Sequence, residues 1–460
     1  MITAETLNEA NDHGLKVIAG FWVNPIGSLN CSVSPCMYTL NTYNADSNDP
    51  GLNVPFDLTN PYITNDILMR FENYVNTFKN RGEILFWTIG NENNLSLNPN
   101  DPVQVKAWYS LADQMAKAAH AIEGADHHPV AVVNGDIQFI GDAAAGADDN
   151  NMTDVDIWGA NTYRGRSFRD YFIQYKNLSA KPLWISEYGI DAWQSCDTTV
   201  PAGCDPNNPA GSEDQLDQAL WDGDMWDEIA GNGDITIGAT VMEYSDEWWK
   251  PYDWICANPP YSNYVNGPAN AAECHFIHFN FGEGPGSSLS PNSSSFISPS
   301  PDHYANEEWW GLMGISNASP EIQADTMTPR EAYTTLQKKF LDFRNNTAIA
   351  SYLILPFNDG NPLNSATITF TWSLGKGVSR YELLIGTSAG GEDVYFRSGT
   401  DTSATVSGIP LTGKPLYVQL ASYMNGSWQS KNYIFQTVDM PALYSITASA
   451  GAGGKIDPSG

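Results

Sequence analysis

The chain has 460 residues, a length that allows roughly two to four domains. Its 53 acidic and 22 basic residues leave a formal net charge of −31, and such a field repels nucleic acids and anionic membranes. No apolar run reaches the ~18 residues that would span a membrane, so we expect no membrane insertion. A neutral polymer is the partner that this surface favours. Aromatic residues make up 12% of the chain. A tryptophan-rich core and aromatic rings that stack on sugar faces explain this content equally well.

The first three quarters of the chain alternate apolar strands with amphipathic helices. Strands are expected at residues 15–23, 83–90, 129–134, 155–161, 182–187 and 235–243. Helices are expected at 65–80, 103–122, 140–145, 168–176, 213–230 and 328–340. The strands are almost continuously apolar, as in sheets that are buried on both faces. This alternation predicts an α/β fold with a parallel sheet connected by helical crossovers.

Six strands are two fewer than the eight that close a (β/α)8 TIM barrel. The sequence opens inside a helix, at residues 4–13. We therefore expect residues 1–344 to be a TIM-barrel catalytic domain whose first two strands are missing from this sequence. A sheet in that state would leave two strand edges unpaired.

The character of the sequence changes beyond about residue 345, where helical patterns cease. Short alternating strands are expected at 367–372, 380–385, 417–421 and 433–437, with turn residues between them. This pattern predicts an all-β sandwich of the immunoglobulin or fibronectin type over residues 345–440. Residues 441–460 are expected to begin a further β module.

The six cysteines fall into three near pairs, and none has the spacing of a zinc site. Short-loop disulfides in an oxidising compartment are favoured over free thiols, so we expect a secreted, extracellular protein. Residues 1–5 nevertheless do not read as a signal peptide, which again suggests a fragment. The three pairs are Cys31 with Cys36, Cys196 with Cys204, and Cys256 with Cys274.

Two of the expected strands end on a glutamate, Glu92 in Trp-Thr-Ile-Gly-Asn-Glu-Asn and Glu187 in Leu-Trp-Ile-Ser-Glu-Tyr-Gly. Burying a carboxylate at the end of a strand costs several kcal/mol of desolvation unless a hydrogen-bonded or charged partner compensates. A carboxylate kept at such a position therefore suggests a functional role. The carboxyl ends of barrel strands converge on one face. Two glutamates there can reach the ~5–5.5 Å separation of the nucleophile and the acid/base in retaining glycosidases.

Neighbouring strand ends carry side chains that would complete such a site. Asn91 can hydrogen-bond a sugar hydroxyl, and the strand end of Asn161 and Tyr163 could aim its phenol at Glu187 and favour the ionised nucleophile. Taken singly, an Asn-Glu pair or a tyrosine means little, whereas three such strand ends together are specific. Consecutive tryptophans at 248–249 and 309–310 suit sugar subsites, with core packing as the alternative. The remaining candidates for substrate binding are Trp22, Glu243, Tyr244, Trp248 and Trp249.

Neither a metal nor a cofactor is expected. The segment 46–51 resembles a calcium-binding loop in composition. Pro50 occupies a ligand position, however, and no glutamate closes the loop, so a solvated turn is favoured. The histidine pairs at 127–128 and at 275 and 278 are expected to be isolated from carboxylate and cysteine ligands. They are interpreted as surface histidines.

The motifs also resemble those of a known group of enzymes. Asn91-Glu92 and Ser186-Glu187-Tyr188-Gly189 resemble the acid/base and nucleophile signatures of clan A retaining glycoside hydrolases, a resemblance that spans residues 4–342. Residues 241–250 with 309–312 are similar to family 72 β-1,3-glucanosyltransferases, and residues 87–92 to family 2 barrels. Residues 350–438 resemble a fibronectin type III module. The clan's second-strand arginine has no counterpart in this sequence.

The resemblance implies a retaining β-glycoside hydrolase or transglycosylase that acts on a neutral β-glucan, with β-1,3 linkages favoured. Hydrolysis and transfer share the glycosyl-enzyme intermediate, and the sequence does not separate them. The competing hypothesis is a catalytically inactive carbohydrate-binding or adhesion protein that reuses the barrel. In either case a polysaccharide or oligosaccharide is the expected partner.

Overall fold

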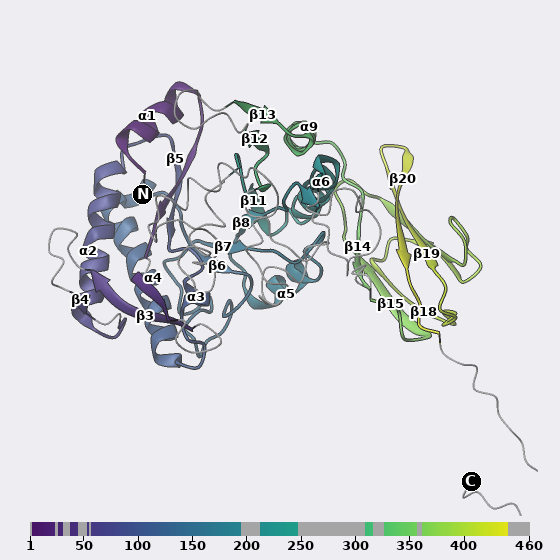
Figure 1. Ribbon diagram of the computed structural model, residues 1–460, viewed down its shortest axis with the longest axis horizontal. Helices are drawn as coiled ribbons and strands as arrows, with labels where there is room; N and C mark the ends of the chain where they lie inside the picture. Colours follow the sequence, from purple (N-terminus) through teal and green to yellow (C-terminus); the bar gives the residue numbers. More distant parts are fainter. Residues whose placement is uncertain are drawn as a thin grey trace, which may run out of the picture. The chain divides into compact units, whose positions relative to one another are not determined.

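The chain divides into two compact units, Met1–Ile349 and Ala350–Gly460. Figure 1 shows the computed structural model as a ribbon coloured along the sequence. It describes residues 2–23, 26–30, 37–44, 53–54, 57–194, 212–246, 309–315, 326–356 and 361–439.

The centre of the first unit is a parallel sheet whose strands follow one another in chain order. This is the expected α/β architecture, and all six expected strands are confirmed. Among the described residues the edges of the sheet are β1 and β11, as in part of a TIM-barrel-like sheet. The strands are β1 (Val17–Phe21), β5 (Ile84–Ile89), β6 (Val130–Gly135), β7 (Ile157–Asn161), β8 (Leu183–Tyr188) and β11 (Thr236–Val241).

Helices connect the strands and begin at recognisable caps. Asn60 accepts a hydrogen bond from Tyr62 N at the start of α2, and Asp101 accepts from Val103 N and Gln104 N at the start of α4. In Figure 1, α2 and α4 lie side by side, and α6 packs against α9. The helices are α1 (Ala4–Asp12), α2 (Pro61–Phe78), α3 (Asn93–Ser96), α4 (Pro102–Glu123), α5 (Tyr171–Leu178), α6 (Gln215–Gly231), α9 (Glu331–Arg344) and the 3-10 turn η1 (Gly124–Asp126).

The helix expected at residues 140–145 does not form, and that prediction was wrong. The segment consists of turns. Gly141 and Gly146 both have positive φ, at 81° and 73°, a conformation that ends a helix. Asp142 Oδ1 accepts hydrogen bonds from the backbone N–H groups of Ala144 and Ala145, so a side chain satisfies donors that a helix would have paired.

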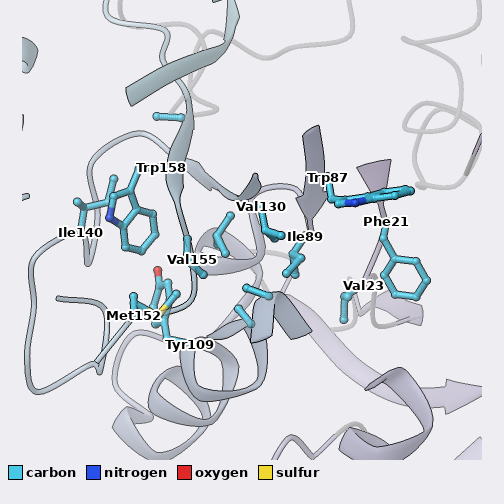
Figure 2. Packing of buried hydrophobic residues seen from close by; sticks show 14 of the residues in the cluster. Phe21, Val23, Trp87, Ile89, Tyr109, Val130, Ile140, Met152, Val155 and Trp158 are labelled. Carbon is cyan, nitrogen blue, oxygen red and sulfur yellow. The ribbon is translucent and has the colours of Figure 1, made fainter. Parts of the chain in front are cut away.

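A large aromatic core lies between the sheet and its helices (Figure 2). Trp87, Tyr109 and Trp158 are fully buried, and the rings of Tyr109 and Trp158 meet edge to face at 6.0 Å. The phenol of Tyr109 is satisfied by the Asn134 amide, 3.1 Å away. Burial of each such ring contributes roughly 1.5–3 kcal/mol to the free energy of unfolding. The packed core therefore fixes the positions of the strand ends.

Shorter antiparallel sheets complete the first unit. No helix among the described residues is long and apolar enough to cross a membrane. The short strands are β2 (Ile26–Asn30), β3 (Met37–Asn44), β4 (Asn53–Val54), β9 (Trp193–Gln194), β10 (Ser212–Glu213), β12 (Met313–Ile315) and β13 (Met327–Pro329).

The second unit is all-β, as expected, and consists of two antiparallel sheets around one apolar core. Alternate residues of β15, β16 and β19 face that core, among them Phe370, Leu383 and Val418. The assignment to an immunoglobulin or fibronectin type stays a prediction, and the module expected at 441–460 lies outside the described residues. The sheets contain β14 (Leu353–Leu355), β15 (Thr367–Trp372) and β18 (Ser403–Ser407), and β17 (Tyr395–Gly399), β16 (Arg380–Gly386), β19 (Leu416–Met424) and β20 (Ser427–Phe435).

Candidate active site

Both strand-end glutamates lie at the carboxyl edge of the parallel sheet. Glu92 follows β5 and Glu187 is the penultimate residue of β8. Tyr163 follows β7, and Met242 follows β11. Both glutamates are half-buried. In a parallel α/β sheet this edge is where ligands bind, because all strands end there and the connecting loops surround it.

A tight backbone turn positions Glu92. Gly90 has φ +68°, and a Cβ there would lie 2.2 Å from Asn93 Oδ1 and 2.9 Å from the ring of Trp108. Glu92 itself is left-handed at φ 53°, a conformation that costs roughly 1–2 kcal/mol for a residue with a side chain. The Glu92 N–H donates to the carbonyl of Val133, on β6, at 3.1 Å. The turn therefore holds the glutamate over β5 and β6.

The side chain of Asn161 joins the surroundings of the two glutamates. Its Nδ2 donates to Glu92 Oε1 and to Asn91 Oδ1, both at 3.1 Å. Its Oδ1 accepts from the hydroxyl of Ser186 at 2.7 Å. Asn161 is buried, so these bonds are shielded from water and each fixes the orientation of its partner.

The phenol of Tyr163 donates to Glu187 Oε2 at 2.8 Å, the contact expected from the sequence. The same oxygen lies 3.0 Å from Met242 Sδ. The ring of Tyr163 packs edge-on against Trp310 with the centroids 5.2 Å apart. A hydrogen bond from a neutral phenol favours the ionised carboxylate, so Tyr163 both orients Glu187 and stabilises its charge.

The chain after Glu187 leaves no room for a side chain at Gly189. Its φ is +150°, and a Cβ there would lie 2.5 Å from the carbonyl oxygen of Met242. Asp222, on α6, is buried behind this turn and accepts a hydrogen bond from the Ile190 backbone. Burial raises the pKa of Asp222 well above its usual range, and burial likewise raises the pKa of the Tyr188 phenol.

A second buried polar group anchors the segment that follows β11. The Glu243 N–H donates to the carbonyl of Trp310 at 3.2 Å, after a cis Met242–Glu243 peptide. Asp246 is fully buried and accepts from Arg330 Nη2 at 2.9 Å and from Gly311 N at 3.1 Å. This ion pair holds the end of the β11 segment against residues 310–315.

The other predicted binding residues are placed as follows. Trp22 is 61% exposed and Tyr244 is 59% exposed, so both side chains are open to a ligand. The Asn91 amide oxygen already accepts from Asn161. Trp310 is buried against Tyr163, and its expected role as an open stacking platform was wrong, because its ring packs within the protein. Trp248, Trp249 and all six cysteines lie outside the described residues.

The sequence analysis assigned no role at the site to Ser186, Met242 or Asp222, although Ser186 and Met242 lie in segments with a family resemblance. Ser186 interrupts an apolar strand just before Glu187, and a polar residue at a buried strand position is a usable signal. Met242 and Asp222 read as ordinary strand and helix residues, and only the packing of β11 and α6 against β8 brings them to the site.

The interpretation of His127 and His128 as residues remote from carboxylates was wrong. His128 Nδ1 lies 2.8 Å from Glu123 Oε1, and His127 stacks on His120, which contacts Asp156 at 2.9 Å. Asp156, before β7, is distant from the histidine pair in the sequence, whereas Glu123, the last residue of α4, is only five residues before His128. The loop 46–51 and His275 and His278 lie outside the described residues.

No protein-family model matches this sequence, and no curated protein matches it. Among solved structures, β-glucuronidase 2 of Bacteroides uniformis has a TM-score of 0.38 at 13% identity, over 96% of this chain and 41% of that chain. The endo-β-1,4-mannanase of Thermotoga petrophila has a TM-score of 0.36 at 11% identity, over 83% of this chain and 73% of that chain. The chain thus spans less than half of the glucuronidase. At such scores the neighbours do not define an activity, which rests on the chain's own residues.

The buried carboxyl of Asp222 generates a prediction about stability and pH. Because its folded pKa is raised, its stabilising contribution is fully present below the unfolded pKa of about 3.9 and is lost as pH rises toward the folded pKa. Asparagine mimics the neutral acid. We expect Asp222→Asn to exceed the wild type in free energy of unfolding at pH 7.5 by more than about 1 kcal/mol, with the gap closing near pH 4.

Urea denaturation followed by tryptophan fluorescence at both pH values measures this difference. Asp224→Asn, on the same helix and more exposed, is the matched control. If the free energies of unfolding of Asp222→Asn and the wild type differ by the same amount at both pH values, a raised pKa of Asp222 does not explain the difference.

Proposed function

We propose that this protein is a retaining β-glycoside hydrolase or transglycosylase, with Glu187 as nucleophile and Glu92 as acid/base. The observation that carries the proposal is the hydrogen-bonded set at the sheet edge. Asn161 connects the Glu92 carboxylate with Ser186, and the phenol of Tyr163 donates to Glu187. Two carboxyl groups oriented by different partners are what a double displacement requires.

In the first step, Glu187 attacks the anomeric carbon of the sugar while protonated Glu92 donates its proton to the departing glycosidic oxygen. The products are a leaving group with a free hydroxyl and an ester between the sugar and Glu187. Tyr163 holds the attacking carboxylate through its 2.8 Å hydrogen bond. Asn161 holds the Glu92 carboxyl at the carboxyl edge of β5 and β6.

In the second step, the Glu92 carboxylate removes a proton from water or from a sugar hydroxyl. The resulting oxygen attacks the anomeric carbon, whose bond to Glu187 breaks. Water yields hydrolysis and a sugar yields transfer; both regenerate Glu187 as a carboxylate and Glu92 as an acid. The active-site geometry is common to both outcomes.

A neutral β-glucan is the proposed substrate. The guanidinium of Arg164, just beyond Tyr163, is engaged by Asp136 at 2.8 Å and by Asp170 at 3.4 Å, so its charge is already compensated. The net charge of −31 also opposes anionic glycans. The exposed rings of Trp22 and Tyr244 suit stacking on sugar faces. The resemblance to family 72 favours β-1,3 linkages.

The remaining parts of the proposal concern the setting of the enzyme. We propose a secreted protein with disulfides between the near cysteine pairs, and a fibronectin type III-like second unit. An inactive carbohydrate-binding protein is the alternative, and the nucleophile variant described next distinguishes it from an enzyme.

Glu187→Gln in the full-length protein is expected to abolish turnover, because an amide cannot form the glycosyl ester. A 2-fluoro glycoside, which traps that ester, should add its glycosyl mass to the wild type and not to the variant. Intact-mass spectrometry measures both. Glu9→Gln, on exposed α1, is the control and should label fully. Labelling of Glu187→Gln would remove Glu187 as nucleophile, and absence of labelling in the wild type would favour the inactive alternative.

Glu92→Ala is expected to reduce turnover of substrates with poor leaving groups by roughly 10²–10⁴-fold, since their departure needs the acid. Activated aryl glycosides should suffer least in the first step. Added azide should restore their turnover and yield a β-glycosyl azide, because the anion attacks the ester without a general base. Kinetics with product analysis tests this. If azide neither rescues the variant nor forms the azide product, Glu92 is not the acid/base.

A panel of neutral and anionic oligosaccharides tests the substrate. We expect β-1,3-linked gluco-oligosaccharides to be converted and uronate or sulfated chains to be left intact, since the acidic surface repels them. Chromatography by size separates the products: chains longer than the starting oligomer mean transfer, and shorter chains alone mean hydrolysis. Conversion confined to the anionic glycans would contradict the substrate proposed here while leaving the glutamate roles standing.

A further inference from the structure

A cluster of metal-ligating side chains lies at the amino-terminal edge of the parallel sheet. His120 is in the last turn of α4, His127 precedes β6, and Asp156 precedes β7. Each offers one ligand atom, and these atoms all lie within 4.8 Å of one another. The cluster is half-buried. Glu92 and Glu187 lie at the opposite, carboxyl edge of the same sheet, so the cluster is separate from the proposed active site.

The donor atoms of the cluster, but not its stacked rings, lie near the spacing of a tetrahedral site. His120 Nε2 lies 2.9 Å from Asp156 Oδ2, and the imidazoles of His120 and His127 stack at 3.8 Å between centroids. With zinc–ligand distances of ~2.0–2.2 Å, tetrahedral ligands stand ~3.3–3.5 Å apart. The His120–Asp156 pair is already near this spacing. Binding of one ion requires His127 to rotate out of the stack with His120, because two imidazoles on one tetrahedral zinc have ring centroids about 5 Å apart.

The orientation of the ligands is fixed by further hydrogen bonds. Nδ1 of His127 faces the backbone carbonyl of His128 at 3.3 Å. A carbonyl only accepts, so Nδ1 carries the proton and Nε2 is left to coordinate. Asp156 Oδ2 accepts from the Val130 N–H at 2.8 Å. Bonds of this kind, from the outer ring nitrogen and to the carboxylate, commonly accompany metal ligation and hold the ligands in place.

An ordinary ion pair explains only part of the arrangement. A contact between His120 and Asp156 needs no second imidazole, yet His127 also places a ligand atom within 4.8 Å of theirs. A cation bound by both imidazoles and the carboxylate gives this third side chain a role. The net charge of −31 also favours uptake of a divalent cation.

We propose that His120, His127 and Asp156 bind a zinc ion, with water as the fourth ligand. Two imidazoles and one carboxylate are a donor set that suits zinc rather than calcium or magnesium, which prefer oxygen. The ion ties the end of α4 to the starts of β6 and β7, three segments that are distant in the sequence. Its role is structural, and the site does not depend on the proposed glycosidase activity.

The test is a zinc titration of the intact protein after EDTA treatment and removal of the chelator. Competition with a chromophoric chelator measures affinity and stoichiometry, and a thermal unfolding series measures Tm. We expect one zinc ion per chain at this site and a Tm that rises with zinc concentration. Cobalt(II) in place of zinc should produce the visible absorption of a four-coordinate site with nitrogen ligands.

His127→Ala is the discriminating variant, because its ring supplies one ligand without being part of the His120–Asp156 contact. It is expected to weaken zinc binding by at least about tenfold and to abolish the Tm rise. His13→Ala, whose side chain is 71% exposed on the far end of α1, is the control and should bind as the wild type does. A double variant, His120→Gln with His127→Ala, should lose the cobalt absorption.

Two outcomes would overturn the proposal. One is the absence of saturable zinc binding up to 100 times the protein concentration. The other is zinc binding that His127→Ala leaves unchanged, which would place the ion at another site of the chain. If the double variant does not fold, the comparison of His127→Ala with His13→Ala still decides between these results.

Discussion

The arrangement of the candidate active site depends on the buried amide of Asn161. An amide has both donors and an acceptor, and here the donors face Asn91 and Glu92 while the acceptor takes the hydroxyl of Ser186. A single side chain on the middle strand β7 thereby aligns residues from β5 and β8. In a buried setting each of these bonds is stronger than in water, and each unpaired group would be costly. The arrangement is therefore cooperative, and it holds Glu92 and the Ser186–Glu187 strand end together.

Two buried carboxyl groups next to the candidate active site stabilise its neighbouring segments, Asp246 the segment after β11 and Asp222 the turn after Glu187. They do so in different ways. Asp246 is matched by Arg330, so its burial is compensated by charge and by hydrogen bonds. Asp222 has no such cation among the described residues; its burial raises its pKa, and the neutral acid is the form that the fold favours. One support therefore depends on an ion pair and the other on protonation of Asp222, so the stability of the turn after Glu187 depends on pH.

The two edges of the sheet carry different sets of polar side chains. At the carboxyl edge the side chains converge on carboxylates and a phenol, and at the amino edge two imidazoles meet Asp156. Parallel strands produce this separation because every strand begins at one edge and ends at the other. The second unit has its own apolar core.

The sequence by itself determined the alternation of strands and helices, the change to an all-β unit, and the position of Glu92 and Glu187 at strand ends. These features follow from periodicity and from the cost of a buried charge, both of which are local. The turns at 140–146 were missed because two positive-φ glycines and the Asp142 side chain outweigh a weak helical pattern. Only the tertiary structure decided that Trp310 packs inward, that Asp222 supports the turn after Glu187, and that His127 meets His120 beside Asp156. Such contacts join residues from separate elements, and their partners are chosen by the packing of whole helices and strands.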